Sequence, residues 1–302
     1  MDVATKCYYL KMAAIGQFPR LDIDESSFVA IRDSLSILRH ALAIEEKYEI
    51  VVRNFIELER EVLSVAVEDS LRSGDVYLQS FETRSSLNVR VVNFLTSVRL
   101  YLDQLPGHLR RCISCDDSSE TVKALKREQY DSVFEYRFME ALRNYVQHNG
   151  VPVHLVVFGA SRPEFDQKYV EHSLRFCAKK EHLALDKKFK RSVLHEMPEK
   201  VWLGAASRTY FGCICRIHMA VRAMVKSASD QSRAILDKNI SDYMVLFDSL
   251  PVALHAYEAE GGCVLDKFSV FVDWDEVRLA LIKKNSDVSN VGRWYVTGKG
   301  GD

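Results

Sequence analysis

The sequence predicts a mainly α-helical protein: a helical bundle with additional C-terminal helices and a few short strands. Glycine and proline are sparse, with 13 and 6 among 302 residues, which suits long helices and argues against folds rich in tight turns. Apolar residues recur at three- and four-residue steps over long stretches, the spacing of a buried helix face. The hydrophobic fraction of 47% and the charged fraction of 27% are those of an ordinary globular protein.

Three helical blocks are expected in the first half of the chain: residues 26–72, 82–105 and 118–148. A Ser-Gly pair at 73–74 follows the first block and a Pro-Gly pair at 106–107 follows the second, and such residues commonly end helices. The first block is too long for one typical helix, so two helices are expected there. The second block carries a clear apolar stripe, formed by Leu87, Val91, Phe94, Leu95, Val98, Tyr101 and Leu102. Long helices joined by short turns suggest an up-and-down bundle.

The second half of the chain alternates helical and strand-like segments. Residues 151–158 are apolar and β-branched, which predicts a strand. The remaining expectations are helix over 164–194, two or three helices over 200–260, a helix near 274–284, and short β-like pieces at 267–272 and 293–297. No linker marks a domain boundary clearly. A cut near residue 160 gives a bundle over 1–160 and a mainly helical region over 161–302, and one continuous domain is the alternative.

Charge and hydropathy exclude several classes of protein. The net charge is −1, so a nucleic-acid contact would require a local basic patch. No apolar run approaches the roughly 18–20 residues that cross a bilayer, and Lys6 and Lys11 interrupt the apolar residues near the start. The seven cysteines are odd in number and scattered, as expected for reduced thiols. These features predict a cytoplasmic protein with no membrane contact.

The sequence predicts no metal or other cofactor. Cys112 and Cys115 form a CxxC, and Cys213 and Cys215 form a CxC with His218 three residues on. Zinc requires four converging ligands, and the spacing between these two groups matches no common zinc module. The second group also lies in an apolar, helical stretch, where buried cysteine is common. The segment GASRP at 159–163 lacks both the GxGxxG pattern and the lysine of a phosphate-binding loop.

The stretch EALRNYVQHNGVPVH, residues 140–154, combines polar residues at the end of a predicted helix. Glu140, Asn144 and His148 are spaced by four residues and therefore share one helix face. Arg143 and His148 are five residues apart, about 140° around an ideal helix. They could converge on one ligand if His148 lies in a distorted last turn, which the following Asn-Gly pair favours.

These residue types suit metal-free cleavage of RNA, in which the 2′-hydroxyl attacks the neighbouring phosphate. His148 would act as general acid or base. Arg143 would hold the phosphate and stabilise its developing charge. Asn144 would position the phosphate, and Glu140 would hold Arg143 or Asn144. Two simpler interpretations remain open: a cation in the last turn is a common helix end, and Arg143 could pair with Glu140 at the surface.

The order Arg143, Asn144, three residues, His148 near the end of a long helix resembles the motif of the HEPN superfamily. The resemblance implies a bundle that dimerises so that two copies of the motif line one cleft. It also implies a metal-independent endoribonuclease, often a toxin or antiviral effector, with a cognate antitoxin or regulatory protein as a further partner. It is strong over the six residues 143–148, extends to 26–160 by architecture, and leaves 161–302 without an interpretation.

A second candidate lies in the run KKEHLALDKKFKR, residues 179–191. Its cations at Lys187, Lys188, Lys190 and Arg191, beside Phe189, would offer phosphate contacts and a stacking surface to RNA. The simpler interpretation is the solvated side of a helix. Two hypotheses follow: a dimeric metal-independent ribonuclease, or a non-catalytic helical module that binds RNA or protein partners. His154 is expected near the end of the 118–148 helix and is a weak additional candidate.

Overall fold

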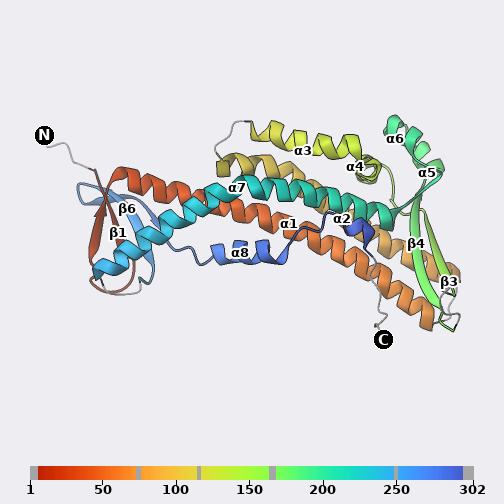
Figure 1. Cartoon of the computed structure of the whole chain (residues 1–302), viewed down its shortest axis with the longest axis horizontal. Helices are drawn as coiled ribbons and strands as arrows, with labels where there is room; N and C mark the ends of the chain where they lie inside the picture. Colours follow the sequence, from red (N-terminus) through yellow and green to blue (C-terminus); the bar gives the residue numbers. More distant parts are fainter. Residues whose placement is uncertain (1–5, 73–75, 114–116, 163–167, 248–250, 295–302) are drawn as a thin grey trace. The chain divides into compact units, whose positions relative to one another are not determined.

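Most of the residues lie in helices, as the sequence predicts. The computed structural model describes residues 6–72, 76–113, 117–162, 168–247 and 251–294. Helices account for 67% of the residues that the structure describes, which confirms the mainly α class (Figure 1). The helices are α1 Glu25–Leu71, α2 Val76–Ile113, α3 Ser118–Ser132, α4 Phe134–His148, α5 Lys180–Ala184, α6 Arg191–Glu196, α7 Leu203–Phe247 and α8 Asp275–Lys284, with a 3-10 turn at Val291–Arg293.

The chain divides into two compact units, each assembled from separate segments. Unit 1 comprises residues 1–46, 104–119 and 220–286, and unit 2 comprises residues 47–103, 120–219 and 287–302. The long helices α1, α2 and α7 each contribute residues to both units. The sequence suggested a cut near residue 160, a position that falls inside unit 2.

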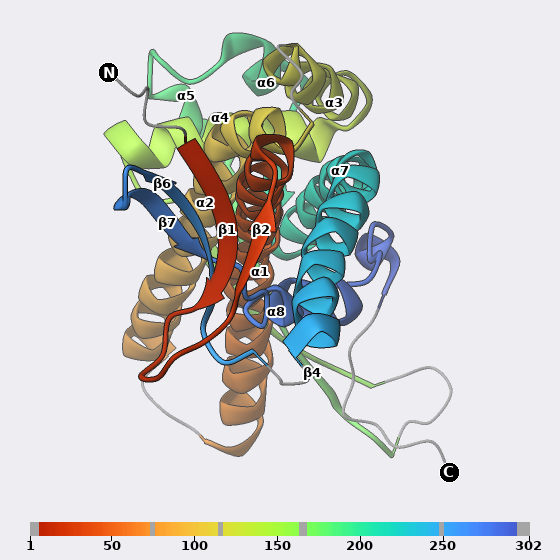
Figure 2. The ribbon, with the colours of Figure 1, turned by 90° about the vertical axis from the view of Figure 1, so that its left-hand side faces the viewer.

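Unit 1 contains a four-stranded antiparallel sheet in the order β2-β1-β6-β7. Its strands are β1 Lys6–Met12, β2 Arg20–Ile23, β6 Leu254–Glu260 and β7 Cys263–Ser269, and Figure 2 shows β1 beside β2. Alternate β1 residues, Tyr8, Leu10 and Met12, are buried and belong to one core cluster with Phe28 of α1 and Tyr243 of α7. A strand with one buried face has this period of two. The sheet therefore packs on the unit's portions of α1 and α7.

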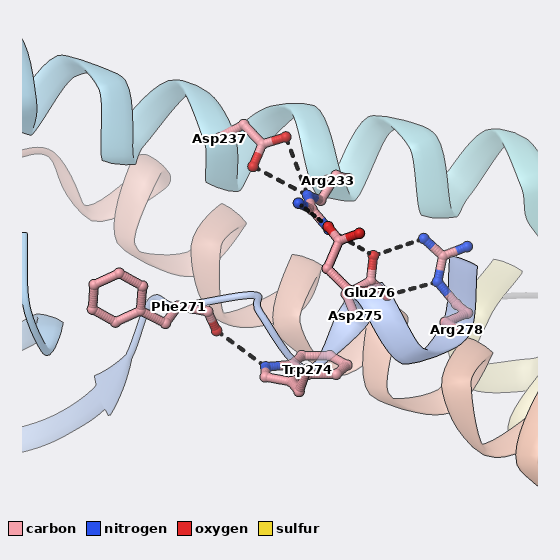
Figure 3. A network of polar contacts seen from close by, with 7 residues as sticks. All are labelled: Arg233, Asp237, Phe271, Trp274, Asp275, Glu276 and Arg278. Carbon is pink, nitrogen blue, oxygen red and sulfur yellow. Dashed lines mark hydrogen bonds and ion pairs between the residues drawn. The ribbon is translucent and has the colours of Figure 1, made fainter. Parts of the chain in front are cut away.

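A buried ion-pair network joins α8 to α7 within unit 1 (Figure 3). Asp275 is fully buried and Arg278 is 5% exposed. The Nε and Nη2 atoms of Arg278 donate to the two carboxylate oxygens of Asp275 at 2.6 and 2.8 Å. Arg233 of α7 donates to Asp275 at 3.2 Å and to Glu276 at 2.8 Å. Because buried charges require partners, this network fixes how α8 sits on α7.

Unit 2 combines helices with a three-stranded antiparallel sheet in the order β3-β4-β5. The strands are β3 Leu155–Ser161, β4 Glu171–Lys179 and β5 Lys200–Trp202. Aromatic rings fill much of the core: Phe55 of α1 stacks on Phe211 of α7 with 4.3 Å between ring centroids, and Phe94 of α2 lies 5.6 Å from Phe55. All seven residues of the predicted α2 stripe are buried. These rings pack α1, α2 and α7 together within unit 2.

Several predicted helix boundaries are wrong. Residues 25–71 form one helix instead of two, and the Ser-Gly pair expected to end it lies outside the described residues. α2 continues through Pro106 to Ile113, where the sequence predicted a stop. Proline removes one backbone hydrogen bond and costs about 3 kcal/mol inside a helix. Leu105 and Leu109 on either side of Pro106 are 1% and 0% exposed, so burial of the continuing apolar face outweighs that cost.

The second half departs further from the prediction. The 118–148 block is two helices, because Val133 between α3 and α4 has an extended backbone with φ −125° and ψ 115°. Residues 171–179, predicted helical, form β4, and residues 254–260, also predicted helical, form β6. The strand expected at 151–158 begins four residues later as β3. The helix near 274–284 is confirmed as α8. Residues 295–297 of the last β-like piece lie outside the described residues, and 291–293 form the 3-10 turn.

Candidate functional site

All four residues of the predicted catalytic set lie on α4. The helix is regular up to His148, because the backbone N–H of Asn149 still donates to the carbonyl of Tyr145 at 2.8 Å. Arg143 and His148 therefore remain about 140° apart around the helix. A distorted turn that would bring them together in one chain is not seen before His148. A site that took Arg143 from one copy of the chain and His148 from another would not need such a turn.

Glu140 and Arg143 have separate partners. The hydroxyl of Tyr210 on α7 donates to Oε1 of Glu140 at 2.5 Å. Burial, followed by the charge of Glu140, raises the pKa of Tyr210 well above its ordinary value. Arg143 donates from Nη1 to Oε1 of Gln147 at 2.9 Å, and its buried Nε has no hydrogen-bond partner in the part of the chain that the structure describes. The described residues contain no Glu140–Arg143 ion pair, so Glu140 joins α4 to α7.

Asn144 and His148 occupy the outer face of α4, and both are exposed. Asn144 lies on the wall of a cavity of about 510 Å³ that Glu140 also lines. Arg143 and His148 do not line it. His148 follows Asn144 by one helical turn on the same face. The helix thus presents to this cavity two of the three residues of the predicted polar stripe, Glu140 and Asn144.

The cavity, which we call the basic pocket, lies among α3, α4 and the residue before α6. Five cationic side chains line it, against the two carboxylates of Asp131 and Glu140. The cations are Lys123, Lys126, Arg127, Arg137 and Lys190. Several cations on one concave surface attract a negatively charged ligand strongly. The pocket is therefore suited to a polyanion.

The cations of the basic pocket differ in how they are held. Arg137 forms a bidentate pair with Glu196 of α6, and this hydrogen bonding raises its pKa. Lys123 pairs with Glu120 at 2.7 Å. Within the described residues, Lys126 and Arg127 form neither a hydrogen bond nor an ion pair. These two side chains are the ones that can bind an incoming anion without first breaking an internal contact.

An aromatic ring lies among these cations. The ring of Tyr130 is half-buried in the wall of the pocket, and Nζ of Lys190 lies 4.5 Å from its centre and donates to its hydroxyl. Phe189, which the sequence suggested as the stacking residue, is only 3% exposed. That part of the prediction is wrong, because Phe189 packs inward against Tyr145 at a centroid distance of 6.2 Å.

The basic run at 187–191 is not one helix face. α5 ends at Ala184 and α6 begins at Arg191, with a loop between them. Lys190 alone of the four predicted RNA-binding residues lines the basic pocket. Lys187, Lys188 and Arg191 are exposed outside its lining, and the backbone N–H of Lys188 donates to Asp186 at 2.8 Å. The contribution of α3, through Lys123, Lys126 and Arg127, was missed.

Three of the four cysteines in these groups, Cys112, Cys213 and Cys215, are described and buried. Cys213 and Cys215 are buried in α7, and Arg216 donates to the sulfur of Cys213 at 3.0 Å. His218 is fully buried and stacks on Tyr48 at a centroid distance of 3.7 Å. Cys115 lies outside the described residues. No set of three or more potential metal ligands is found within that part of the chain.

Of the helices that the structure describes, none combines the length and apolar character needed to cross a bilayer. Comparisons with protein-family models, with curated proteins and with solved structures found no match. The HEPN resemblance therefore stays a prediction from six residues of sequence.

Proposed function

We propose that this protein binds single-stranded RNA through the basic pocket. The observation that carries the proposal is the gathering of five cations and the ring of Tyr130 around one cavity. Lysine and arginine neutralise phosphates, and binding releases the counterions that surround the nucleic acid. An aromatic side chain next to such cations offers a surface on which a base can stack.

A flexible single strand suits this pocket better than a duplex. The cavity of about 510 Å³ is concave, and an unpaired nucleotide can turn its base toward Tyr130 while its phosphate faces Lys126 and Arg127. A duplex keeps its bases stacked inside and presents a broad, stiff surface. Asn144 adds an amide that can both donate and accept hydrogen bonds at the pocket wall.

The test is the anisotropy of a fluorescein-labelled oligouridine titrated with protein at several salt concentrations. Each phosphate contact with a single strand contributes about 0.7 to the slope of log affinity against log salt. We expect the double variant Lys126→Gln, Arg127→Gln to bind more weakly and to reduce that slope by about 1.4. The matched control is Lys226→Gln, Lys238→Gln, which neutralises two exposed α7 lysines in i,i+4 ion pairs. Equal losses in both double variants would contradict a specific site.

Cleavage of the bound RNA without metal is a second candidate function. Its support is the exposed His148, one turn beyond Asn144 on the helix face that reaches the basic pocket. An imidazole can exchange protons near neutral pH. Because Arg143 lies on a different side of α4, this function requires a second copy of the chain to complete the site.

A further inference from the structure

A second cavity in unit 2 is independent of the basic pocket. It has a volume of about 530 Å³ and lies among α1, β4, the first turns of α7 and residues 292–294. We call it the tryptophan pocket, because Trp202 and Trp294 both line it. Pockets for small molecules commonly measure roughly 300–1,000 Å³. The cavity is therefore large enough for a ligand of one to three rings.

The walls of the tryptophan pocket are mainly apolar. Val62, Leu63 and Ala66 form one side, on a single face of α1. Leu174 and Phe176 of β4 form another, and they are 8% and 2% exposed. Leu63 itself is 41% exposed, so a ligand would remove apolar surface from water. Burying a non-polar body in this way favours binding through the hydrophobic effect.

One cation in the tryptophan pocket, Arg175, has no anionic partner among the described residues. The guanidinium carbon of Arg175 lies 4.8 Å from the ring centre of Trp202. Stacking on an aromatic face holds a guanidinium in place while its N–H groups stay free at the edges. Across the described residues, Arg175 forms neither a side-chain hydrogen bond nor an ion pair. Its guanidinium group is held in place by the tryptophan ring and can bind a carboxylate with two parallel hydrogen bonds.

The other charged groups of this pocket compensate one another. Arg208 donates from Nε to Glu59 at 2.9 Å and from Nη1 to the carbonyl of Trp294 at 2.8 Å. Its charge is therefore balanced, and Arg175 supplies the excess positive charge.

A histidine adds a second polar contact. The buried Nδ1 of His172 lies 3.6 Å from Oδ2 of Asp69 and has no hydrogen-bond partner among the described residues. With Nδ1 facing Asp69, Nε2 is the ring nitrogen available to a molecule in the pocket that His172 lines. An imidazole can donate or accept there, so it can pair with a polar group on a bound ligand.

We propose that the tryptophan pocket binds a small aromatic acid: a body of one or two rings that packs on the apolar walls, with one carboxylate bound by Arg175. His172 contributes a hydrogen bond to a second polar group or to the acid itself. The site is separate from the residues proposed to bind RNA, so either proposal can fail without the other.

The first experiment is calorimetric titration with three probes that share one body and differ in charge: 1-naphthoate, 1-naphthalenemethanol and 1-naphthylmethylamine. We expect 1-naphthoate to bind with one-to-one stoichiometry and a Kd on the order of 100 µM, given its number of heavy atoms. The neutral alcohol should bind about tenfold more weakly, because it lacks a charge-assisted hydrogen bond. The amine should bind most weakly of the three.

Two substitutions separate the acid contact from the apolar contact. Arg175→Gln should weaken 1-naphthoate about tenfold and leave the alcohol unchanged. Ala205→Phe should abolish binding of both probes by filling the pocket, and because Ala205 is exposed the fold should tolerate it. The matched control is Arg84→Gln, since Arg84 lies 5.9 Å from the ring of Phe81 in the same unit but outside this pocket. Arg84→Gln should leave the affinity for both probes unchanged.

Three results would overturn the proposal. The first is no heat of binding from any probe at millimolar concentration. The second is binding of 1-naphthoate that survives Arg175→Gln or Ala205→Phe at full strength. The third is an equal loss in Arg84→Gln, which would indicate a general effect of surface charge. The double variant at Lys126 and Arg127 should bind 1-naphthoate as the unmodified chain does.

Discussion

Tyr210 and Glu140 share a hydrogen bond of 2.5 Å between α7 and α4. Tyr210 is 1% exposed, so its hydroxyl depends on this carboxylate for its hydrogen bond. Glu140 was expected to orient Arg143 or Asn144, and the structure gives it a bond to another helix instead. The hydrogen bond therefore has a structural role: it holds α4, which carries Asn144 and His148, against the core of unit 2.

Substitutions at this pair should change stability more than RNA binding. Glu140→Ala leaves a buried tyrosine hydroxyl without an acceptor, which costs about 1–3 kcal/mol. Tyr210→Phe removes the hydroxyl itself, and the half-buried Glu140 can still reach water, so we expect a loss of about 1 kcal/mol. Urea denaturation of both variants measures these differences. An unchanged midpoint for Glu140→Ala together with lost RNA binding would instead assign Glu140 to the site.

The network around Asp275 predicts a larger effect in unit 1 (Figure 3). Asp275→Ala leaves the nearly buried Arg278 without its carboxylate, and breaking a buried pair from one side costs about 3–5 kcal/mol. Asp237→Ala is the matched control, because Asp237 is 53% exposed and pairs with Arg233 one turn away on α7. Such a pair contributes about 0.5 kcal/mol. Thermal unfolding should show a much larger loss of Tm for Asp275→Ala than for Asp237→Ala. Equal losses of Tm would contradict the argument that burial makes the Asp275 pair more important.

The sequence predicts the helices well where one face alone is apolar. The stripe from Leu87 to Leu102 is buried in full, because a period of three and four residues has few other interpretations. Pro106 led to a wrong helix end. Local preference predicts that the helix stops at this proline, but the burial of Leu105 and Leu109 stabilises its continuation. β1 and β4 contain charged residues, and β1 also pairs with β6 near the other end of the chain, a contact that local patterns do not reveal.

The candidate site shows the same limit. The polar stripe on α4 follows from spacing alone, as Glu140, Asn144 and His148 demonstrate. The partner of Glu140 could not be predicted, because Tyr210 is seventy positions away in the chain. Lys123, Lys126 and Tyr130 recur at helical spacing on α3, and that pattern was available in the sequence. Their meeting with Lys190 is a tertiary contact that no local pattern contains.

His154 predicts a pH dependence of stability. Burial, then the nearby His182, lowers its pKa to about 4, and its Nδ1 accepts the backbone N–H of Lys179 at 2.9 Å. The unfolded chain binds a proton at about pH 6.5, above the folded value. This contribution to stability is therefore present above pH 6.5 and is lost as the pH falls towards 4.

The loss should be on the order of 2 kcal/mol, measured by urea denaturation at pH 7 and pH 4.5. His182 and Lys179 both lower the pKa of His154, and Arg84 lines the same cavity as both histidines. Since other groups also titrate, the relevant quantity is the difference from His154→Gln, which should show a shallower decline. His195→Gln, at an exposed position, is the control and should follow the unmodified chain. Identical profiles for all three proteins would contradict the assignment.

Metal-independent cleavage of RNA at α4 has a test that uses the geometry of the helix. Arg143 and His148 lie about 140° apart around α4, so a working site would combine Arg143 of one copy with His148 of another. Labelled total RNA incubated in EDTA should be cut by the unmodified protein, and neither by Arg143→Ala nor by His148→Ala. Cleavage by both variants would point to a contaminant or to another site.

Mixing the two inactive variants decides whether the site is shared between copies. After unfolding and refolding together, half of the dimers would contain one chain of each kind. Each mixed dimer has one site with both Arg143 and His148 intact, so about a quarter of the unmodified activity should return. A mixture that stays inactive while the unmodified dimer cuts RNA would place both residues in one chain. In the alternative outcome, the unmodified protein binds RNA without cutting it, with a salt dependence that falls in the Lys126→Gln, Arg127→Gln variant. That result would identify a binding module, because those two cations contribute to affinity and not to cleavage.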